Sequence, residues 1–132
     1  MIMKARDLMI GDWIQDGNSF PMRIVTVGEG WAYADFEGNE ADPWEYRDRD
    51  FADGTANPVE LTAAMLEANG FRALGRGTWQ RHCGDETIRV DATGIVSMAD
   101  GSLLARARKV HELQHVLRLV GLVGLADNFR LE

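Results

Sequence analysis

MRIVTVGEGWAYADF, residues 22–36, is the stretch that decides the expected fold of this 132-residue chain. Residues 22–27 are β-branched and mostly apolar, and residues 31–36 begin with aromatic side chains at alternate positions. Both patterns are typical of short strands. Gly28-Glu29-Gly30 lies between them and signals a turn, because glycine tolerates the backbone angles of tight turns. The stretch therefore predicts an antiparallel hairpin.

A third short strand is expected upstream, at Trp13-Ile14-Gln15, because the turn signal Asp16-Gly17-Asn18 follows it. Three short strands joined by glycine turns predict a small, strongly bent sheet of the SH3-like β-barrel type. Residues 37–57 are polar and acidic, and we expect them to form a long loop or linker.

The second half of the chain has a different pattern, which predicts helices as well as strands. Thr62 is a suitable N-cap for a helix that ends at Gly70, since its hydroxyl can accept a free N–H of the first turn. Two hairpins are expected next, with turns at Gly84-Asp85 and Asp100-Gly101, and then a last helix from about residue 109 to 120.

These patterns predict an α+β fold. A small N-terminal SH3-like β-barrel unit with an acidic loop would cover residues 1–56. An α-β-β-β-β-α unit, made of a helix, two β-hairpins and a C-terminal helix, would cover residues 57–132. We expect the two to form one compact domain.

Composition narrows the class of protein. The chain is 45% hydrophobic and 27% charged, as in ordinary soluble domains. Cys83 is its only cysteine, so no intrachain disulfide can form, which fits a reducing compartment. The formal net charge of −7 disfavours general nucleic-acid binding. No apolar stretch is long enough to span a bilayer. We therefore expect a cytoplasmic protein with no membrane partner.

Three segments resemble uncharacterised small proteins of phages and mobile elements of gut Bacteroidetes. DLMIGDWI (residues 7–14) resembles their LRIGN opening, NPVELTAAMLEANGF (57–71) their PIPLTEE-x-L-x-x-x-GF segment, and VHELQHVLRLVG (110–121) their VHQLQNLYFALTG helix. The resemblance implies a small accessory gene product carried by a phage. It implies no particular activity.

His111-Glu112-Leu113-Gln114-His115 has the H-E-x-x-H spacing of zinc hydrolases. A catalytic zinc needs a third protein ligand, and only Asp127 and Glu132 offer carboxylates after His115. The similar proteins also have Gln and Asn in place of Glu112 and His115. A zinc metallohydrolase is therefore the least favoured alternative, and we expect no metal, no cofactor and no catalytic residues.

The favoured function is ligand binding without catalysis. Arg106 and Arg108 would share one face of a strand. His111, His115 and Arg118 would lie on the solvent face of the following helix, opposite a core stripe of Val110, Leu113, Leu117 and Val120. The five residues would form a positive patch for an anionic small molecule. Together with the phage resemblance, the patch suggests a protein that sequesters a nucleotide immune signal and so counteracts host defence. Alternatively, these cations form a solvated face and pair with nearby carboxylates.

A second hypothesis is protein–protein interaction, with either a second copy of this chain or a host protein as the partner. It rests on more apolar side chains near the C-terminus than one core face requires, namely Val116, Leu119, Leu122, Val123 and Leu125.

Overall fold

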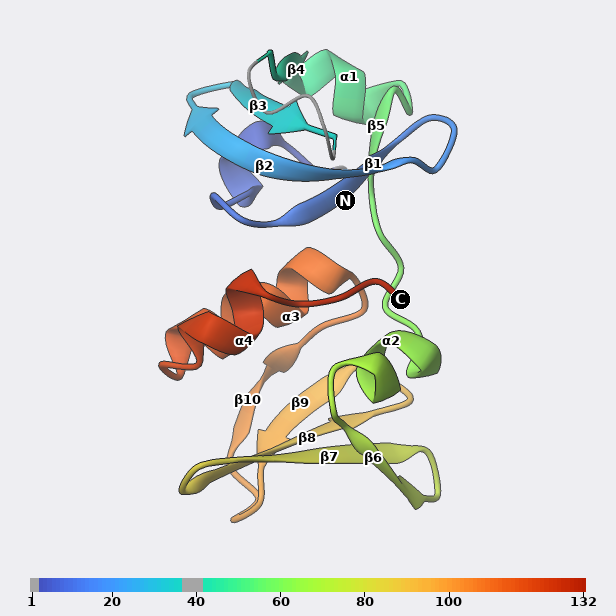
Figure 1. Cartoon of the computed structure of the whole chain (residues 1–132), viewed down its shortest axis with the longest axis vertical. Helices are drawn as coiled ribbons and strands as arrows, with labels where there is room; N and C mark the ends of the chain where they lie inside the picture. Colours follow the sequence, from blue (N-terminus) through green and yellow to red (C-terminus); the bar gives the residue numbers. More distant parts are fainter. Residues whose placement is uncertain (1–2, 37–41) are drawn as a thin grey trace. The chain divides into compact units, whose positions relative to one another are not determined.

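A computed structural model describes residues 3–36 and 42–132, which form ten strands in two five-stranded sheets together with four α-helices (Figure 1). The predicted α+β class is confirmed. The chain divides into two compact units, Met1–Val59 and Glu60–Glu132. The first unit extends past the predicted boundary at residue 56 because its last strand, β5 (Ala56–Pro58), pairs with its first strand, β1 (Trp13–Asp16).

The N-terminal unit is one antiparallel sheet that curls into a half-barrel (Figure 1). A short 3-10 turn, η1 (Ala5–Asp7), precedes β1, and the other elements are β2 (Pro21–Gly28), β3 (Trp31–Asp35), β4 (Trp44–Arg47) and α1 (Asp48–Ala52). The strand order is β4-β3-β2-β1-β5. The hairpin predicted for residues 22–36 is confirmed as β2–β3. The assignment of this unit to the SH3-like barrel type stays a prediction.

Alternation along the strands builds the core of this unit. Ile14, Met22, Ile24, Ala32 and Ala34 are buried at every second position, and the residues between them lie on the other face of the sheet. At the end of the hairpin Gly28 lies directly beside the indole of Trp31, and a Cβ there would lie only 2.1 Å from the ring. Position 28 must therefore be glycine, because any side chain there would clash with Trp31, the aromatic residue that indicated the strand.

The predicted loop at residues 37–57 was wrong for residues 42–57, which contain β4, α1 and β5. Residues 37–41 lie outside the described part of the chain. The acidic residues that suggested a loop cap backbone N–H groups instead. Asp50 accepts a hydrogen bond from the Arg47 N–H (2.7 Å), and Asp48 accepts one from the Ala5 N–H (2.9 Å). Buried Tyr46 and Phe51 anchor the segment.

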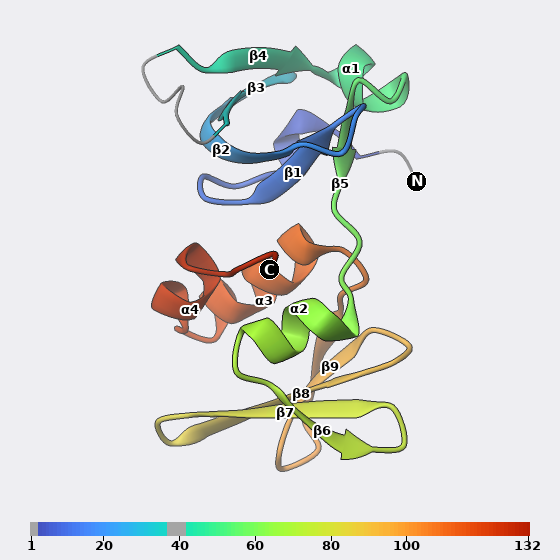
Figure 2. The same ribbon diagram turned by 45° about the vertical axis from the view of Figure 1, so that its right-hand side comes forward.

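The C-terminal unit begins with α2 (Ala63–Ala68), continues as an antiparallel meander and ends with two helices. Its other elements are β6 (Arg72–Gly75), β7 (Thr78–Cys83), β8 (Glu86–Asp91), β9 (Ile95–Met98), β10 (Leu103–Arg106), α3 (Val110–Leu119) and α4 (Val123–Asp127). Figures 1 and 2 show all three helices on one side of this sheet.

The predicted order of helix, two hairpins and helix was incomplete. Both hairpin turns and both helices are present, but the strands form one sheet, with β6 as an additional edge strand and α4 as an additional helix. Residues 72–75 contain no β-branched residue, so β6 depends on its pairing with β7. The α4 helix has only five residues and includes Gly124, so its intrinsic propensity is low.

The predicted caps are confirmed. The Thr62 hydroxyl accepts a hydrogen bond from the Met65 N–H (3.2 Å) at the start of α2. Gly70 and Gly121 follow α2 and α3 with positive φ angles of 85° and 86°, which glycine adopts without steric cost.

Candidate functional site

Glu112 of the H-E-x-x-H motif is a structural residue. Its Oε1 atom accepts hydrogen bonds from the backbone N–H groups of Arg108 (3.1 Å) and Lys109 (2.9 Å). These are donors that the first turn of a helix leaves without intrahelical partners. The Glu112 carboxylate therefore closes the start of α3.

The two histidines of the motif lie next to each other on α3. His111 is buried and His115 is half-buried, and their rings meet edge to face with centroids 5.5 Å apart. Within residues 3–36 and 42–132, no three His, Cys, Asp or Glu side chains are grouped so as to hold a metal ion. The helical wheel that put His111 on the solvent face was wrong.

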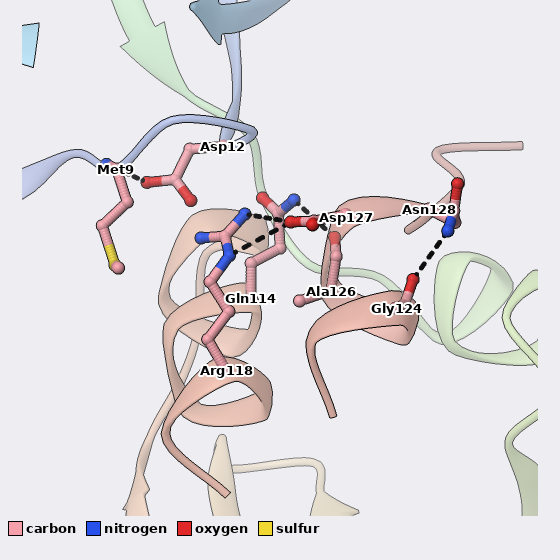
Figure 3. A network of polar contacts seen from close by, with 8 residues as sticks. All are labelled: Met9, Asp12, Gln114, Arg118, Gly124, Ala126, Asp127 and Asn128. Carbon is pink, nitrogen blue, oxygen red and sulfur yellow. Dashed lines mark hydrogen bonds and ion pairs between the residues drawn. The ribbon is translucent and has the colours of Figure 1, made fainter. Parts of the chain in front are cut away.

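The physical reason is that α3 is buried over more than one face. Besides the expected Val110, Leu113 and Leu117, the helix buries Gln114 and Val116. The unpredicted α4 covers part of this additional surface. Figure 3 shows the Gln114 side chain reaching α4, where its Nε2 donates to the Ala126 carbonyl (3.0 Å).

Arg118 also belongs to this helix–helix contact. Its guanidinium reaches the Asp127 carboxylate on α4 at 3.4 Å, and its side chain is largely buried (Figure 3). Directly after Asp127, the Asn128 side chain donates to the Gly124 carbonyl (2.9 Å) and closes the end of α4. Arg118 therefore links α3 to α4.

Arg106 is the last residue of β10, whereas Arg108 lies beyond the end of the strand. The two arginines therefore have different surroundings. The exposed Arg106 influences Asp91, whose pKa is lowered chiefly by the hydrogen bond from the Thr93 hydroxyl and further by the charge of Arg106. Arg108 lies instead beside the start of α2, where its carbonyl accepts a hydrogen bond from the Leu61 N–H (3.0 Å). The structure thus gathers no single patch from the five predicted residues.

A pocket of about 460 Å³ opens beside Arg108 in the C-terminal unit. It lies between the start of α2, strands β7 and β8, the β8–β9 turn and residues 107–108. We call it the α2 pocket; its lining includes Thr62, Leu66, Trp79, Val90, Thr93 and Arg108. The sequence does not reveal this site, because these residues come from separate segments of residues 60–108 that only the fold brings together.

The carboxylates at the α2 pocket are already engaged. Glu60 forms an ion pair with Lys109, and Asp91 accepts hydrogen bonds from both the N–H and the hydroxyl of Thr93 and from the Ile95 N–H. For Arg108, the described part of the chain shows no ion pair. The pocket therefore has an exposed guanidinium that forms no ion pair among the described residues.

Gly94 and Trp79 also line the α2 pocket. A Cβ on Gly94 would approach the Arg108 Cγ to 3.0 Å, so the missing side chain makes room for the arginine. The indole N–H of Trp79 is buried and has no hydrogen-bond acceptor among the described residues.

Comparison of the chain with protein-family models, curated proteins and solved structures finds no match. Among the described helices, none has the length and apolar character needed to cross a membrane.

Proposed function

We propose that this protein is a non-enzymatic binding protein whose α2 pocket holds a small anionic ligand. The observation that carries the proposal is Arg108, a cation at a pocket whose carboxylates already have protein partners. A volume of about 460 Å³ lies in the range of small-molecule sites. Binding would bring the missing negative charge to the guanidinium.

Phosphate is the anion that suits this site best. The planar fork of an arginine donates two parallel hydrogen bonds to phosphate oxygens. Thr62 lines the same pocket, and the apolar sides of Trp79 and Leu66 suit a base or sugar. A nucleotide combines these features. The resemblance to phage proteins supports the further proposal that a cytoplasmic nucleotide signal of host defence is sequestered here.

Thermal shift measurements with cyclic di- and trinucleotides and ADP-ribose derivatives test the proposal. A ligand at about 100 times its Kd stabilises a fold by about 2.7 kcal/mol. For a chain of this size the expected shift in Tm is several degrees.

Two arginines give a matched pair of variants. Arg108→Ala should abolish the shift, and Arg108→Lys should weaken it because lysine lacks the fork. Arg106→Ala is the control, since Arg106 is exposed like Arg108 but does not line the pocket. The proposal fails if none of these nucleotides shifts the melt, or if Arg108→Ala binds as well as the wild type.

Self-association is the second candidate function, and the C-terminal helices favour it. Leu119 is 79% exposed and Val123 is 48% exposed, while Leu122 and Leu125 are half-buried. Val116 is buried and cannot contribute to a surface. Leu119→Lys should reduce the mass of any oligomer held by this apolar surface, and high salt should not.

A further inference from the structure

The register of the C-terminal sheet places one residue from each strand in a single row. Arg72 pairs with Gln80, Gln80 with Arg89, Arg89 with Ser97, and Ser97 with Leu103. Directly paired residues of antiparallel strands point to the same side of a sheet. The row therefore crosses the whole sheet on one face.

This row lies on the side away from the helices. The neighbouring row, Trp79–Val90–Val96, points the opposite way, and Val90 and Val96 are buried in the core. Arg106 pairs with Ile95, next to Val96 in the strand, so it shares the outer side with the first row. We call Arg72, Arg89 and Arg106 the arginine face. They come from β6, β8 and β10.

The arginine face carries positive charge, offset in part by Asp91 on the same side of β8, and it has apolar residues at its edges. Arg72 and Arg106 are exposed, and the Arg89 Nε donates to the Gln80 side chain (2.7 Å). Among the described residues, none of the three forms an ion pair. Leu103 on β10 is 74% exposed, and Leu74 on β6 is 51% exposed. Arginine beside apolar surface is typical of protein interfaces.

The chain itself contains a surface of complementary charge. Residues 60–132 contain nine Lys or Arg and nine Asp or Glu, so their formal charge is zero. Residues 1–59 contain five Lys or Arg and twelve Asp or Glu, so they hold the whole excess of seven negative charges. On the edge strand β4, Trp44 is 58% exposed, and Asp42 and Glu45, close to it in the chain, are exposed too. Because adjacent strand residues alternate, Trp44 and Glu45 flank this edge from opposite sides of the sheet, and Glu45 also pairs with Arg47 (2.8 Å).

We propose that the arginine face docks on the β4 edge of a second copy of this chain. The carboxylates of that edge would meet guanidiniums, and Trp44 would meet arginine and leucine, which favours both cation–π and apolar contact. A single-stranded nucleic acid is the less suited occupant. Its bases stack on aromatic rings, and no Phe, Tyr or Trp lies among the outward strand residues of this sheet.

The mass in solution, measured by light scattering over a range of protein concentrations, tests this proposal. In about 0.01 M salt the average mass should rise with concentration above the 14.7 kDa of the monomer, and in about 1 M salt it should return to that value, because screening shortens to about 3 Å. A chain that stays monomeric in low salt at submillimolar concentration overturns the proposal. So does an association that salt leaves unchanged.

Charge exchange identifies the two surfaces. Arg72→Glu/Arg89→Glu/Arg106→Glu should be monomeric, and so should Asp42→Arg/Glu45→Arg, since each places like charges together. A mixture of the two variants should associate again, because both contacts between them become attractive. If the mixture stays monomeric, the surfaces are not partners.

A matched control reverses three exposed arginines elsewhere, Arg6, Arg49 and Arg130, and gives the same net charge as the first variant. It should keep the wild-type association. If the triple change in the arginine face unfolds the sheet, the edge pair Arg72→Glu/Arg106→Glu replaces it in the same mixture. A surface that binds an oligonucleotide through these arginines, in a chain that is otherwise monomeric, also refutes self-docking.

Discussion

Aspartates that cap turns recur through this protein. Asp53, Asp91 and Asp100 each accept a hydrogen bond from the backbone N–H two residues later, at 2.9, 2.9 and 2.8 Å. The pKa of each carboxyl is lowered, with the hydrogen bond from the following Thr or Ser side chain as the largest cause. Much of the acidity of the sequence therefore serves local structure.

The first prediction concerns the pH dependence of Asp91. Because its pKa is lower in the folded chain, the stability it contributes is present above the ordinary carboxyl pKa and is lost as the pH falls through the lowered value. Thr93→Val removes the hydroxyl, which donates at 2.6 Å, and should raise the pKa of Asp91 toward its ordinary value. NMR titration of the Asp91 carboxyl measures this directly. An unchanged pKa would show that the hydroxyl is not the cause.

The second prediction concerns Glu112. Because its carboxylate caps α3, Glu112→Ala should lower the free energy of unfolding by about 1 kcal/mol, the usual effect of losing a cap. Glu112→Gln should cost less, since its amide oxygen still accepts. Thermal or urea denaturation measures both. Removing metal with EDTA should leave the Tm of all three proteins unchanged, and a Tm that falls in EDTA would revive the zinc reading.

At the scale of elements, α3 gives the third prediction. Leu117 is fully buried, and Leu117→Ala should cost about 2–5 kcal/mol. His115 is only half-buried beside His111, and His115→Ala should cost about 1 kcal/mol, the typical effect of a substitution. Urea denaturation separates the two. Equal costs would mean that the helix presents a different face to the core.

Local patterns revealed those elements whose residues determine them alone. The β2–β3 hairpin, the Thr62 cap and the turns at residues 84–85 and 100–101 follow from alternation, side-chain hydrogen bonding and glycine. β4, β6 and α4 escaped notice because their stability depends on pairing or packing with another element and not on their own residues. The α2 pocket and the arginine face escaped for a related reason, since only the fold brings their residues together. His111 was misplaced because a wheel cannot show how much of a helix is covered.

At the scale of the whole molecule, the two units differ in charge far more than in fold. Both contain a five-stranded antiparallel sheet. Yet the excess of seven acidic residues lies entirely in residues 1–59, while residues 60–132 are balanced. Like charges within one compact unit repel each other and oppose its folding. Screening should therefore affect the two units unequally.

The last prediction follows from this imbalance. Raising salt from about 0.01 M to about 0.1 M shortens the screening length from about 30 Å to about 10 Å. The repulsion within residues 1–59 should weaken, and the buried strand amides of Ile24 and Ala34 should exchange hydrogen more slowly. The amides of Val90 and Val96, in the balanced unit, should change little. Hydrogen exchange at micromolar concentration, where the chains stay apart, separates this effect from association. Equal slowing in both units would contradict this prediction. It would show that salt acts on the protein as a whole, and that the hydrogen bonds to the turn aspartates already offset the repulsion within residues 1–59.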